Sequence, residues 1–275
     1  MSKPIQIQFG INSYKTKSGL LSAERLVNFY AEPAPESSPF RGMLKGTSGL
    51  TVWKNLNQFE PIYGSIEVDE YLYVVCGLNF YQIDSSKNTT LRGTLGGSPD
   101  RVMMTNNRTQ ITILTNNGDS YYFDTGSNTF AKITDADYQS ASSVTTLNHY
   151  SIFTKQSSDQ FFISALNDTT SYSALDFATA EVKADDLVRA YAVNNELWLF
   201  GTQGTEIWQN TGNATFPFER IVGAYIEVGC AAKFSVVNDQ EGLFWLGDDY
   251  CVYQNQGYAA KKISTYPIDE EIRTY

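Results

Sequence analysis

The 275-residue chain is 42% hydrophobic and 14% aromatic, which is enough for one large all-β domain or two smaller domains with buried cores. Its formal net charge of −10 argues against general binding to a phosphate backbone, because that affinity comes from Lys and Arg displacing counterions. No run approaches the roughly 18 to 20 apolar residues of a membrane span, and no apolar segment typical of a signal peptide begins the chain. We therefore expect a soluble protein made in the cytoplasm, without a membrane partner.

Residues 1–59 do not share the pattern of the rest of the chain and are predicted to form an amino-terminal arm. The arm contains a short strand candidate, IQIQF at residues 5–9, and the best helical candidate of the chain, Ser22 to Tyr30. Pro33 and Pro35 end that short helical segment. Such an arm could pack along the rest of the protein or reach a neighbouring subunit.

Five similar units follow the arm between about Glu60 and Thr265. Each has an apolar strand, a short polar turn that usually contains Gly, and a second strand that carries aromatic residues. Equivalent positions in the five units recur at roughly 40 to 47 residues, the period of a four-stranded propeller blade, and these positions are Leu72, Thr112, Ile152, Leu197 and Phe244. The prediction is an all-β fold in which residues 60–275 form a β-propeller of about five blades.

Further strands flank the core of each unit. A strand candidate precedes every unit, at residues 62–68, 100–105, 142–147, 188–193 and 232–237. A basic or polar strand follows four of the units, at residues 89–95, 129–135, 216–222 and 259–265. Four strands per unit is the number that a propeller blade requires.

The acidic pair Asp248-Asp249 occupies the turn between the second and third strands of the fifth unit. The neighbouring units place NNGD, QSSD and TQGT there, and these residue types favour turns because they hydrogen-bond local backbone and tolerate left-handed geometry. The pair is interpreted as a turn and not as a catalytic acid pair.

Few residues of the chain could carry chemistry. His149 is the single histidine, which excludes a His-rich metal site, and its place at the entry to a strand favours a structural role. Cys76, Cys230 and Cys251 are odd in number and form no CxxC, so we expect reduced core thiols. No nucleotide-binding or nucleophile motif is found. We expect no catalytic residue, cofactor or metal.

A carbohydrate-active propeller is the alternative. Asp69, Asp100 and Asp186 lie just before first or second strands, where residues facing a propeller axis arise, and two such acids could flank a sugar bond. Recurring aromatic residues favour packing between blades, although they could also form a sugar-binding shelf, and these are Phe80, Trp198, Trp208, Trp245 and Tyr253. This alternative is a carbohydrate-binding or glycoside-hydrolase-like propeller acting at the host surface. A general protein-interaction propeller is a third possibility.

Two parts of the chain resemble a known family. SAERLVNFYAEPAP at residues 22–35, followed by LKGTSGL at residues 44–50, resembles the opening of the packaged-DNA stabilisation proteins of short-tailed bacteriophages (podoviruses). ERIVGAYIEVGCAA, GLFWLGDD and GYAAKKISTYPIDEEI, within residues 219–272, resemble a later block of the same family. The resemblance covers about a third of the chain directly, and the rest matches as propeller-like repeats.

The resemblance implies a tail accessory or hub protein of the virion, without enzymatic activity. Copies would form a six-fold ring below the portal and adaptor proteins, extend the channel, stabilise the packaged DNA and anchor the tail needle, close to the tailspike proteins. Packaged DNA would pass nearby without specific binding. The phrases that carry the resemblance supply the interface candidates Arg25, Asn28, Phe29, Tyr30, Glu227, Val228, Gly229 and Cys230.

Members of that family are commonly longer than this chain. We therefore expect either a short relative or a fragment whose remaining blade or blades are absent. Two outcomes are open for the closure of the propeller: the strand at residues 5–9 completes it, or the ring of blades stays open.

Overall fold

A computed structural model describes residues 26–38, 42–56, 59–183 and 185–275. The chain divides into two compact units. One is residues 54–264, and the other combines the residues before 54 with residues 265–275. The larger unit is called the propeller unit below.

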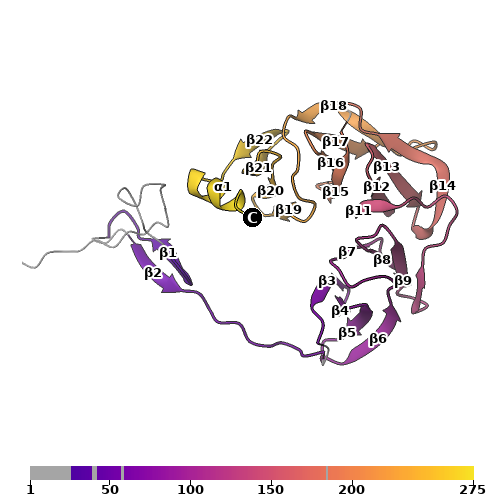
Figure 1. The fold of residues 1–275 in the computed structure, drawn as a ribbon, viewed down its shortest axis with the longest axis horizontal. Helices are drawn as coiled ribbons and strands as arrows, with labels where there is room; N and C mark the ends of the chain where they lie inside the picture. Colours follow the sequence, from indigo (N-terminus) through magenta and orange to yellow (C-terminus); the bar gives the residue numbers. More distant parts are fainter. Residues whose placement is uncertain (1–25, 39–41, 57–58, 184) are drawn as a thin grey trace, which may run out of the picture. The chain divides into compact units, whose positions relative to one another are not determined.

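The propeller unit contains five four-stranded antiparallel sheets, the blades, in each of which neighbouring strands follow one another in the chain (Figure 1). Blade 1 contains β3 (Ile62–Val68), β4 (Tyr71–Cys76), β5 (Asn79–Ile83) and β6 (Thr89–Thr94). Blade 2 contains β7 (Met103–Asn106), β8 (Gln110–Leu114), β9 (Ser120–Asp124) and β10 (Thr129–Lys132). Blade 3 contains β11 (Ala141–Leu147), β12 (Tyr150–Lys155), β13 (Gln160–Ala165) and β14 (Asp168–Thr179). Blade 4 contains β15 (Leu187–Val193), β16 (Glu196–Gly201), β17 (Thr205–Asn210) and β18 (Phe218–Ile226). Blade 5 contains β19 (Val237–Asp239), β20 (Gly242–Leu246), β21 (Val252–Gln256) and β22 (Ala259–Lys262). The predicted all-β propeller is confirmed.

Tight turns between the first and second strands set the register of the blades. Asn148-His149 and Asn194-Asn195 join these strands in blades 3 and 4, and all four residues have positive φ between 48° and 70°. Two successive residues with positive φ give the turn whose twist matches antiparallel strands, and Asn adopts this geometry more easily than most residues. The turn chemistry of the sequence therefore fixes which residues face each other across the hairpin.

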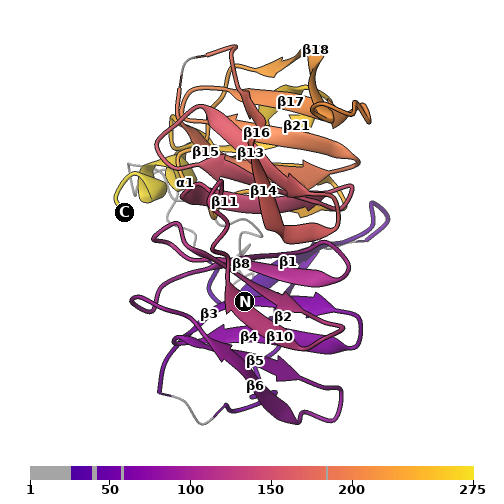
Figure 2. The same ribbon diagram turned by 90° about the vertical axis from the view of Figure 1, so that its right-hand side faces the viewer.

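Aromatic and aliphatic side chains fill every junction between consecutive blades. In Figure 2 the sheets lie one above another with these junctions between them. Four separate buried clusters join blades 1 and 2, 2 and 3, 3 and 4, and 4 and 5. Their central rings are Phe80 and Phe123 at the first junction, Phe153 at the second, Phe161 at the third and Phe200 at the fourth, all with no exposed surface. Among the described residues, no such cluster joins blade 5 to blade 1.

The first strands of the blades lie at the centre of the propeller unit. β3 contacts β7, β7 contacts β11, and β11 contacts β15. Three of these four strands carry a register shift near their start, between Ile62 and Gly64, Ala141 and Ser143, and Leu187 and Arg189. A bulge adds one residue and re-aims the neighbouring side chains. The side chains that follow each bulge therefore point in other directions than they would in a regular strand.

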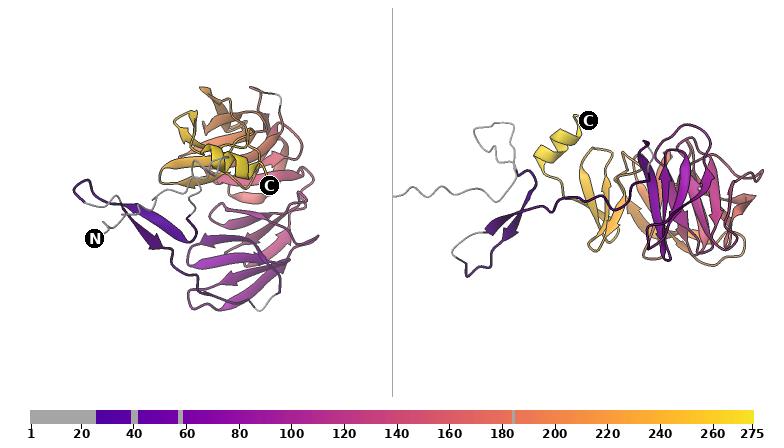
Figure 3. Two further views of the ribbon diagram at one scale, coloured as in Figure 1. Left: turned by 60° about the vertical axis from the view of Figure 1, so that its left-hand side comes forward. Right: turned by 90° about the horizontal axis from the view of Figure 1, so that it is seen from below.

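The second unit contains two short elements within its described residues. β1 (Phe29–Pro33) and β2 (Gly42–Gly46) pair as an isolated two-stranded hairpin, visible in the left view of Figure 3. The helix α1 (Tyr266–Ile272) has Pro in its first turn, where the missing N–H would have no partner within the helix.

The structure differs from the sequence-based expectation in three elements. Phe29 and Tyr30, expected at the end of a helix, belong to β1, because Asn28 has a φ of 59° that a helix does not allow. The strand expected at residues 232–237 is a turn up to Val236, closed by the Ser235 N–H donating to the Ala232 carbonyl at 2.9 Å. Blade 3 also has a fourth strand, β14, that the repeat pattern did not reveal. The strand candidate at residues 5–9 lies outside the described residues.

Phe200→Ala is expected to lower the free energy of unfolding by about 3 to 5 kcal/mol, because it empties a fully buried site between blades 4 and 5. The Phe200 ring centroid lies 6.2 Å from that of Trp198 and 5.5 Å from that of Trp245, so both indoles would lose packing partners. Urea denaturation followed by circular dichroism measures the effect. Leu175→Ala, at a side chain that is 82% exposed, is the control and should change stability by less than about 0.5 kcal/mol.

Candidate functional site

The hairpin β1–β2 holds three of the predicted interface residues. Asn28 precedes β1, and its carbonyl accepts a hydrogen bond from the Thr47 N–H at 2.9 Å, which closes the open end of the hairpin. Phe29 and Tyr30 are the first residues of β1 and pair with Gly46 and Lys45. Arg25, the fourth candidate in the arm, lies outside the described residues.

Both faces of this hairpin expose apolar side chains. Directly opposed residues of an antiparallel pair share a face, so Phe29 and Leu44 lie on one face and Tyr30 and Met43 on the other. These four side chains are 40% to 59% exposed. An isolated two-stranded hairpin is at best marginally stable in water, and exposed apolar surface of this kind marks interaction sites. The hairpin therefore has the properties of a docking element.

The other predicted interface residues form the connection between blades 4 and 5. Gly229 and Cys230 are buried and Val228 is half-buried, whereas Glu227 is exposed. The Gly229 carbonyl accepts from the Trp245 indole N–H at 3.2 Å, and the Cys230 N–H donates to the Gly201 carbonyl at 2.8 Å. These contacts hold the connection inside the propeller unit, and among the four residues Glu227 offers the most surface to a partner.

The turn Asp248-Asp249 of blade 5 holds the connection between blades 4 and 5 in place by a hydrogen bond. The Asp248 carboxylate accepts from the Gly229 N–H at 3.0 Å. The Asp249 carboxylate accepts from the Cys251 N–H at 2.9 Å and from the Tyr253 hydroxyl at 2.8 Å. Both acids lie between β20 and β21, as the repeat pattern predicts, and both serve the fold.

The hydrogen bonds at this turn shift two ionisation equilibria in opposite directions. Partial burial acts to raise the pKa of Asp249, but hydrogen bonds from the Cys251 backbone and the Tyr253 hydroxyl outweigh it and lower the pKa. Burial and the bond to Asp249 raise the pKa of Tyr253 to about 12. The carboxylate and the neutral phenol therefore stabilise each other at neutral pH.

His149 has a structural role, as its position predicts. It sits in the turn between β11 and β12 with a φ of 70°, and its Nδ1 hydrogen-bonds the Asn107 carbonyl at 3.2 Å. That bond joins the corresponding turns of blades 2 and 3. The three cysteines, all among the described residues, are buried and form no disulfide with one another, as expected.

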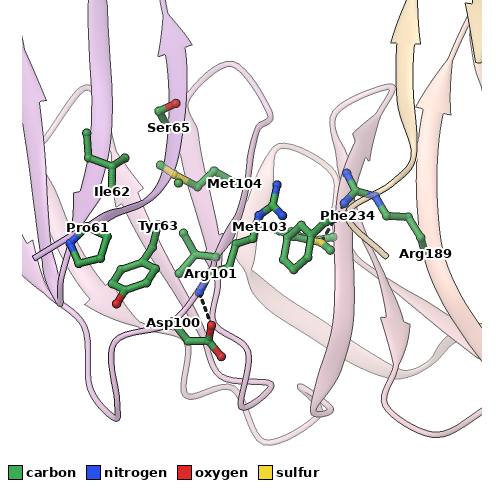
Figure 4. Close-up of a pocket in the computed structure, with 13 residues that line it drawn as sticks. Pro61, Ile62, Tyr63, Ser65, Asp100, Arg101, Met103, Met104, Arg189 and Phe234 are labelled. Carbon is green, nitrogen blue, oxygen red and sulfur yellow. Dashed lines mark hydrogen bonds between the residues drawn. The ribbon is translucent and has the colours of Figure 1, made fainter. Parts of the chain in front are cut away.

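A cavity of about 710 Å³, called the axial cavity below, lies between the first strands of blades 1 to 4 and the segment before β19. Figure 4 shows side chains from β3, β7 and β15 around it. Of the three acids in the carbohydrate hypothesis, Asp100 lines this cavity, whereas Asp69 and Asp186 do not. Asp69 is an exposed turn residue with a φ of 54°, and Asp186 is exposed before β15. A glycosidase needs two facing carboxylates, and these three acids do not provide them.

The described residues form neither a metal site nor a membrane-spanning helix. No three His, Cys, Asp or Glu side chains there gather closely enough to hold a metal ion. No helix there has both the length and the hydropathy to cross a bilayer.

Comparison with protein families gives one match, to the family model described as phage stabilisation, "Bacteriophage P22 Gp10, beta-propeller", over residues 3–275. The chain belongs to this family. Its members are structural β-propellers of bacteriophages that take part in stabilising packaged DNA, which makes the family one of virion components. The family resemblance stated from the sequence is confirmed.

No curated protein matches the chain. Similar solved structures include the crystal structure of BamB from Moraxella catarrhalis, with 12% identity, a TM-score of 0.51, and coverage of 85% of this chain and 74% of that one. The computationally designed Ika8 protein has 7% identity and a TM-score of 0.50, over 74% of this chain and 61% of that one. PorZ, a surface component of the type-IX secretion system of Porphyromonas gingivalis, has 12% identity and a TM-score of 0.48, over 77% of this chain and 29% of that one. At 7% and 12% identity, the likeness to Ika8 and BamB shows only that this chain has a similar fold.

Sequence reasoning did not find the basic side chains at the axial cavity. Arg101 and Arg189, which line it, belong to different blades, 88 positions apart in the chain. Lys233 adjoins the lining residue Phe234, in the segment that was expected to be a strand. Their one signal in the sequence is the recurrence of Arg or Lys near the first strand of three units.

Gly229→Ala is expected to destabilise this family member by about 1 to 3 kcal/mol. An added Cβ would lie 2.4 Å from both the carbonyl carbon and the carbonyl oxygen of Thr202, and backbone atoms cannot move away cheaply. Thermal and urea unfolding measure the loss. Gly49→Ala is the control, because nothing lies within 4 Å of its added Cβ; equal stability of the two variants would contradict the packing argument.

Asp249→Asn should cost more stability at pH 7 than at pH 3. The folded pKa of Asp249 is lower than its unfolded value of about 3.9, so its carboxylate stabilises the fold above that value. This contribution is lost as the pH falls through the folded pKa. Urea unfolding of both proteins at the two pH values is the measurement. Tyr253→Phe, which removes one donor, should reduce the pH-dependent difference, and the same difference at both pH values would refute the assignment.

Proposed function

We propose that this family member is a tail hub component that assembles as a ring, of six copies, below the portal and adaptor proteins. The ring extends the channel, keeps the packaged DNA in the capsid and anchors the tail needle. The observation that carries the proposal is the hairpin β1–β2, which exposes Phe29 and Leu44 on one face and Tyr30 and Met43 on the other. In a ring, the hairpin of each copy packs on a neighbouring protein and removes this apolar surface from water.

The charge of the chain fits a wall that DNA passes without being held. A net charge of −10 leaves no general basic surface for the phosphate backbone, so the hub retains the genome sterically and does not grip it. The propeller unit supports this role mechanically, because four buried junctions fix its blades as one body. No enzymatic step is needed for it.

Mass photometry of the purified chain, alone and mixed with a cognate portal–adaptor assembly, tests the proposal. We expect a discrete ring or a saturable shift of the assembly. The double variant Phe29→Ser, Leu44→Ser should weaken association about tenfold or more, because both substitutions remove apolar contact area.

Val222→Ser is the matched control, since this side chain is 92% exposed on β18, outside the hairpin. It should assemble like the unaltered chain. A chain that stays monomeric and never binds the assembly would refute the proposal, and so would a hairpin variant that assembles as well as the control.

A further inference from the structure

Two arginines and one aromatic ring meet at the axial cavity (Figure 4). Arg101 precedes β7 of blade 2, and its guanidinium carbon lies 4.0 Å from the centroid of the Phe234 ring. Arg189 comes from β15 of blade 4 and donates from Nη1 to the Lys233 carbonyl at 2.9 Å. Side chains of blade 2, of blade 4 and of the segment before blade 5 thus lie side by side at this cavity.

Lys233 anchors this segment. Its ammonium donates to the Asn116 side-chain carbonyl at 2.7 Å and lies 5.4 Å from the Phe234 ring centroid. The segment before β19 therefore crosses to blade 2 and holds Phe234 against the Arg101 guanidinium, while its Lys233 carbonyl accepts from Arg189. The arrangement is built into the fold and does not depend on a mobile surface loop.

The positive charges at this site outnumber the acids beside it: of the three cations Lys233 is attracted by Asp100, which acts to raise the pKa of the ammonium against the larger effect of burial. Arg101, Arg189 and Lys233 take part in none of the ion pairs found among the described residues. Among the described residues, Asp100 is the single carboxylate that lines the axial cavity, and its oxygens accept from the Arg101 backbone N–H at 2.7 Å and from the Asn116 side-chain amide at 2.7 Å. Like charges that converge in a partly desolvated site cost free energy unless an anion joins them.

Burial and charge act on Arg189 in the direction that this cost requires. Burial lowers the pKa of its guanidinium, and repulsion from Arg101 acts in the same direction. Its Nε is buried without a hydrogen-bond acceptor. Arg189 follows the bulge between Leu187 and Arg189 in β15, the kind of irregularity that re-aims a side chain toward a site. Arg189 is therefore a partly buried cation that the bulge directs to the cavity, with its Nε donor unused.

The rest of the axial cavity is suited to an organic group. Ile62, Tyr63 and Met104 line it on the side of blades 1 and 2, away from Arg189 in Figure 4. A volume of about 710 Å³ is far more than one inorganic ion fills and lies within the range of small-molecule pockets.

We propose that the axial cavity binds a small organic phosphate, with the phosphate between Arg101 and Arg189 and the organic body against Tyr63 and Met104. A phosphate monoester carries about 1.5 to 2 negative charges and three strong hydrogen-bond acceptors. A ligand with this charge neutralises two guanidinium groups, whereas a ligand with a single carboxylate carries one charge only. The proposal does not depend on ring assembly. A cavity of this size admits a small molecule and not a DNA duplex, so it also leaves the channel role unchanged.

Isothermal titration calorimetry with the full chain tests this site. The probes are phenyl phosphate, inorganic phosphate and benzoate. We expect saturable binding of phenyl phosphate, weaker binding of inorganic phosphate because it lacks the apolar contact, and weaker binding of benzoate because it carries one charge. Arg101→Gln should weaken phenyl phosphate binding about tenfold or more, since it removes charged hydrogen bonds.

Arg101 is solvent-exposed, so its variant should fold normally, and circular dichroism checks this. Arg92→Gln is the matched control, because Arg92 also lies over an aromatic ring, 5.6 Å from the Phe123 centroid, but outside the axial cavity. It should bind phenyl phosphate like the unaltered chain. No saturable binding, equal affinity of the Arg101 and Arg92 variants, or benzoate binding as tightly as phenyl phosphate would each overturn the proposal.

Discussion

The fold depends on the burial of aromatic side chains between consecutive blades. A four-stranded sheet of about twenty residues cannot bury enough apolar surface alone, so each blade is stable only against its neighbour. Phe123 packs on Tyr73 and Phe80 of blade 1, and Phe200 lies between Trp198 and Trp245 at the last junction. Because every inner blade has two neighbours, stability and spatial order come from the same contacts, as in other repeat proteins.

The packing at these junctions also determines which strands and side chains lie at the axis of the propeller. Packing of the blades brings β3, β7, β11 and β15 together, and polar residues then tie the inner strands to each other. Thr105 and Thr146 share a hydrogen bond of 2.7 Å between blades 2 and 3, and the Ala190 N–H donates to the Ser143 hydroxyl at 2.9 Å between blades 3 and 4. Arg189 differs from these paired groups, because its Nε is buried without a hydrogen-bond acceptor at the cavity that Arg101 also lines.

Family membership and geometry support the same kind of protein. A propeller whose acids serve turns, as Asp248 and Asp249 do, suits a structural component of the virion better than an enzyme. The hairpin exposes apolar side chains on both faces, whereas the four buried junctions join the blades of the propeller unit into one body. Fold alone would not distinguish this protein from unrelated propellers, so the assignment depends on the family match.

The sequence by itself determined the blades and their turns, because strand alternation and turn chemistry are local and repeat about every 40 residues. It placed Asp248-Asp249 in a turn, His149 at a strand entry and the large aromatics between blades. It did not reveal β14, whose polar residues lack the alternation of the other strands, or the turn at Lys233–Val236, whose apolar residues are typical of a strand. Only the tertiary structure decided which charges meet at the axis, because Arg101, Arg189 and Phe234 become neighbours through the rotation between blades, which no local pattern encodes.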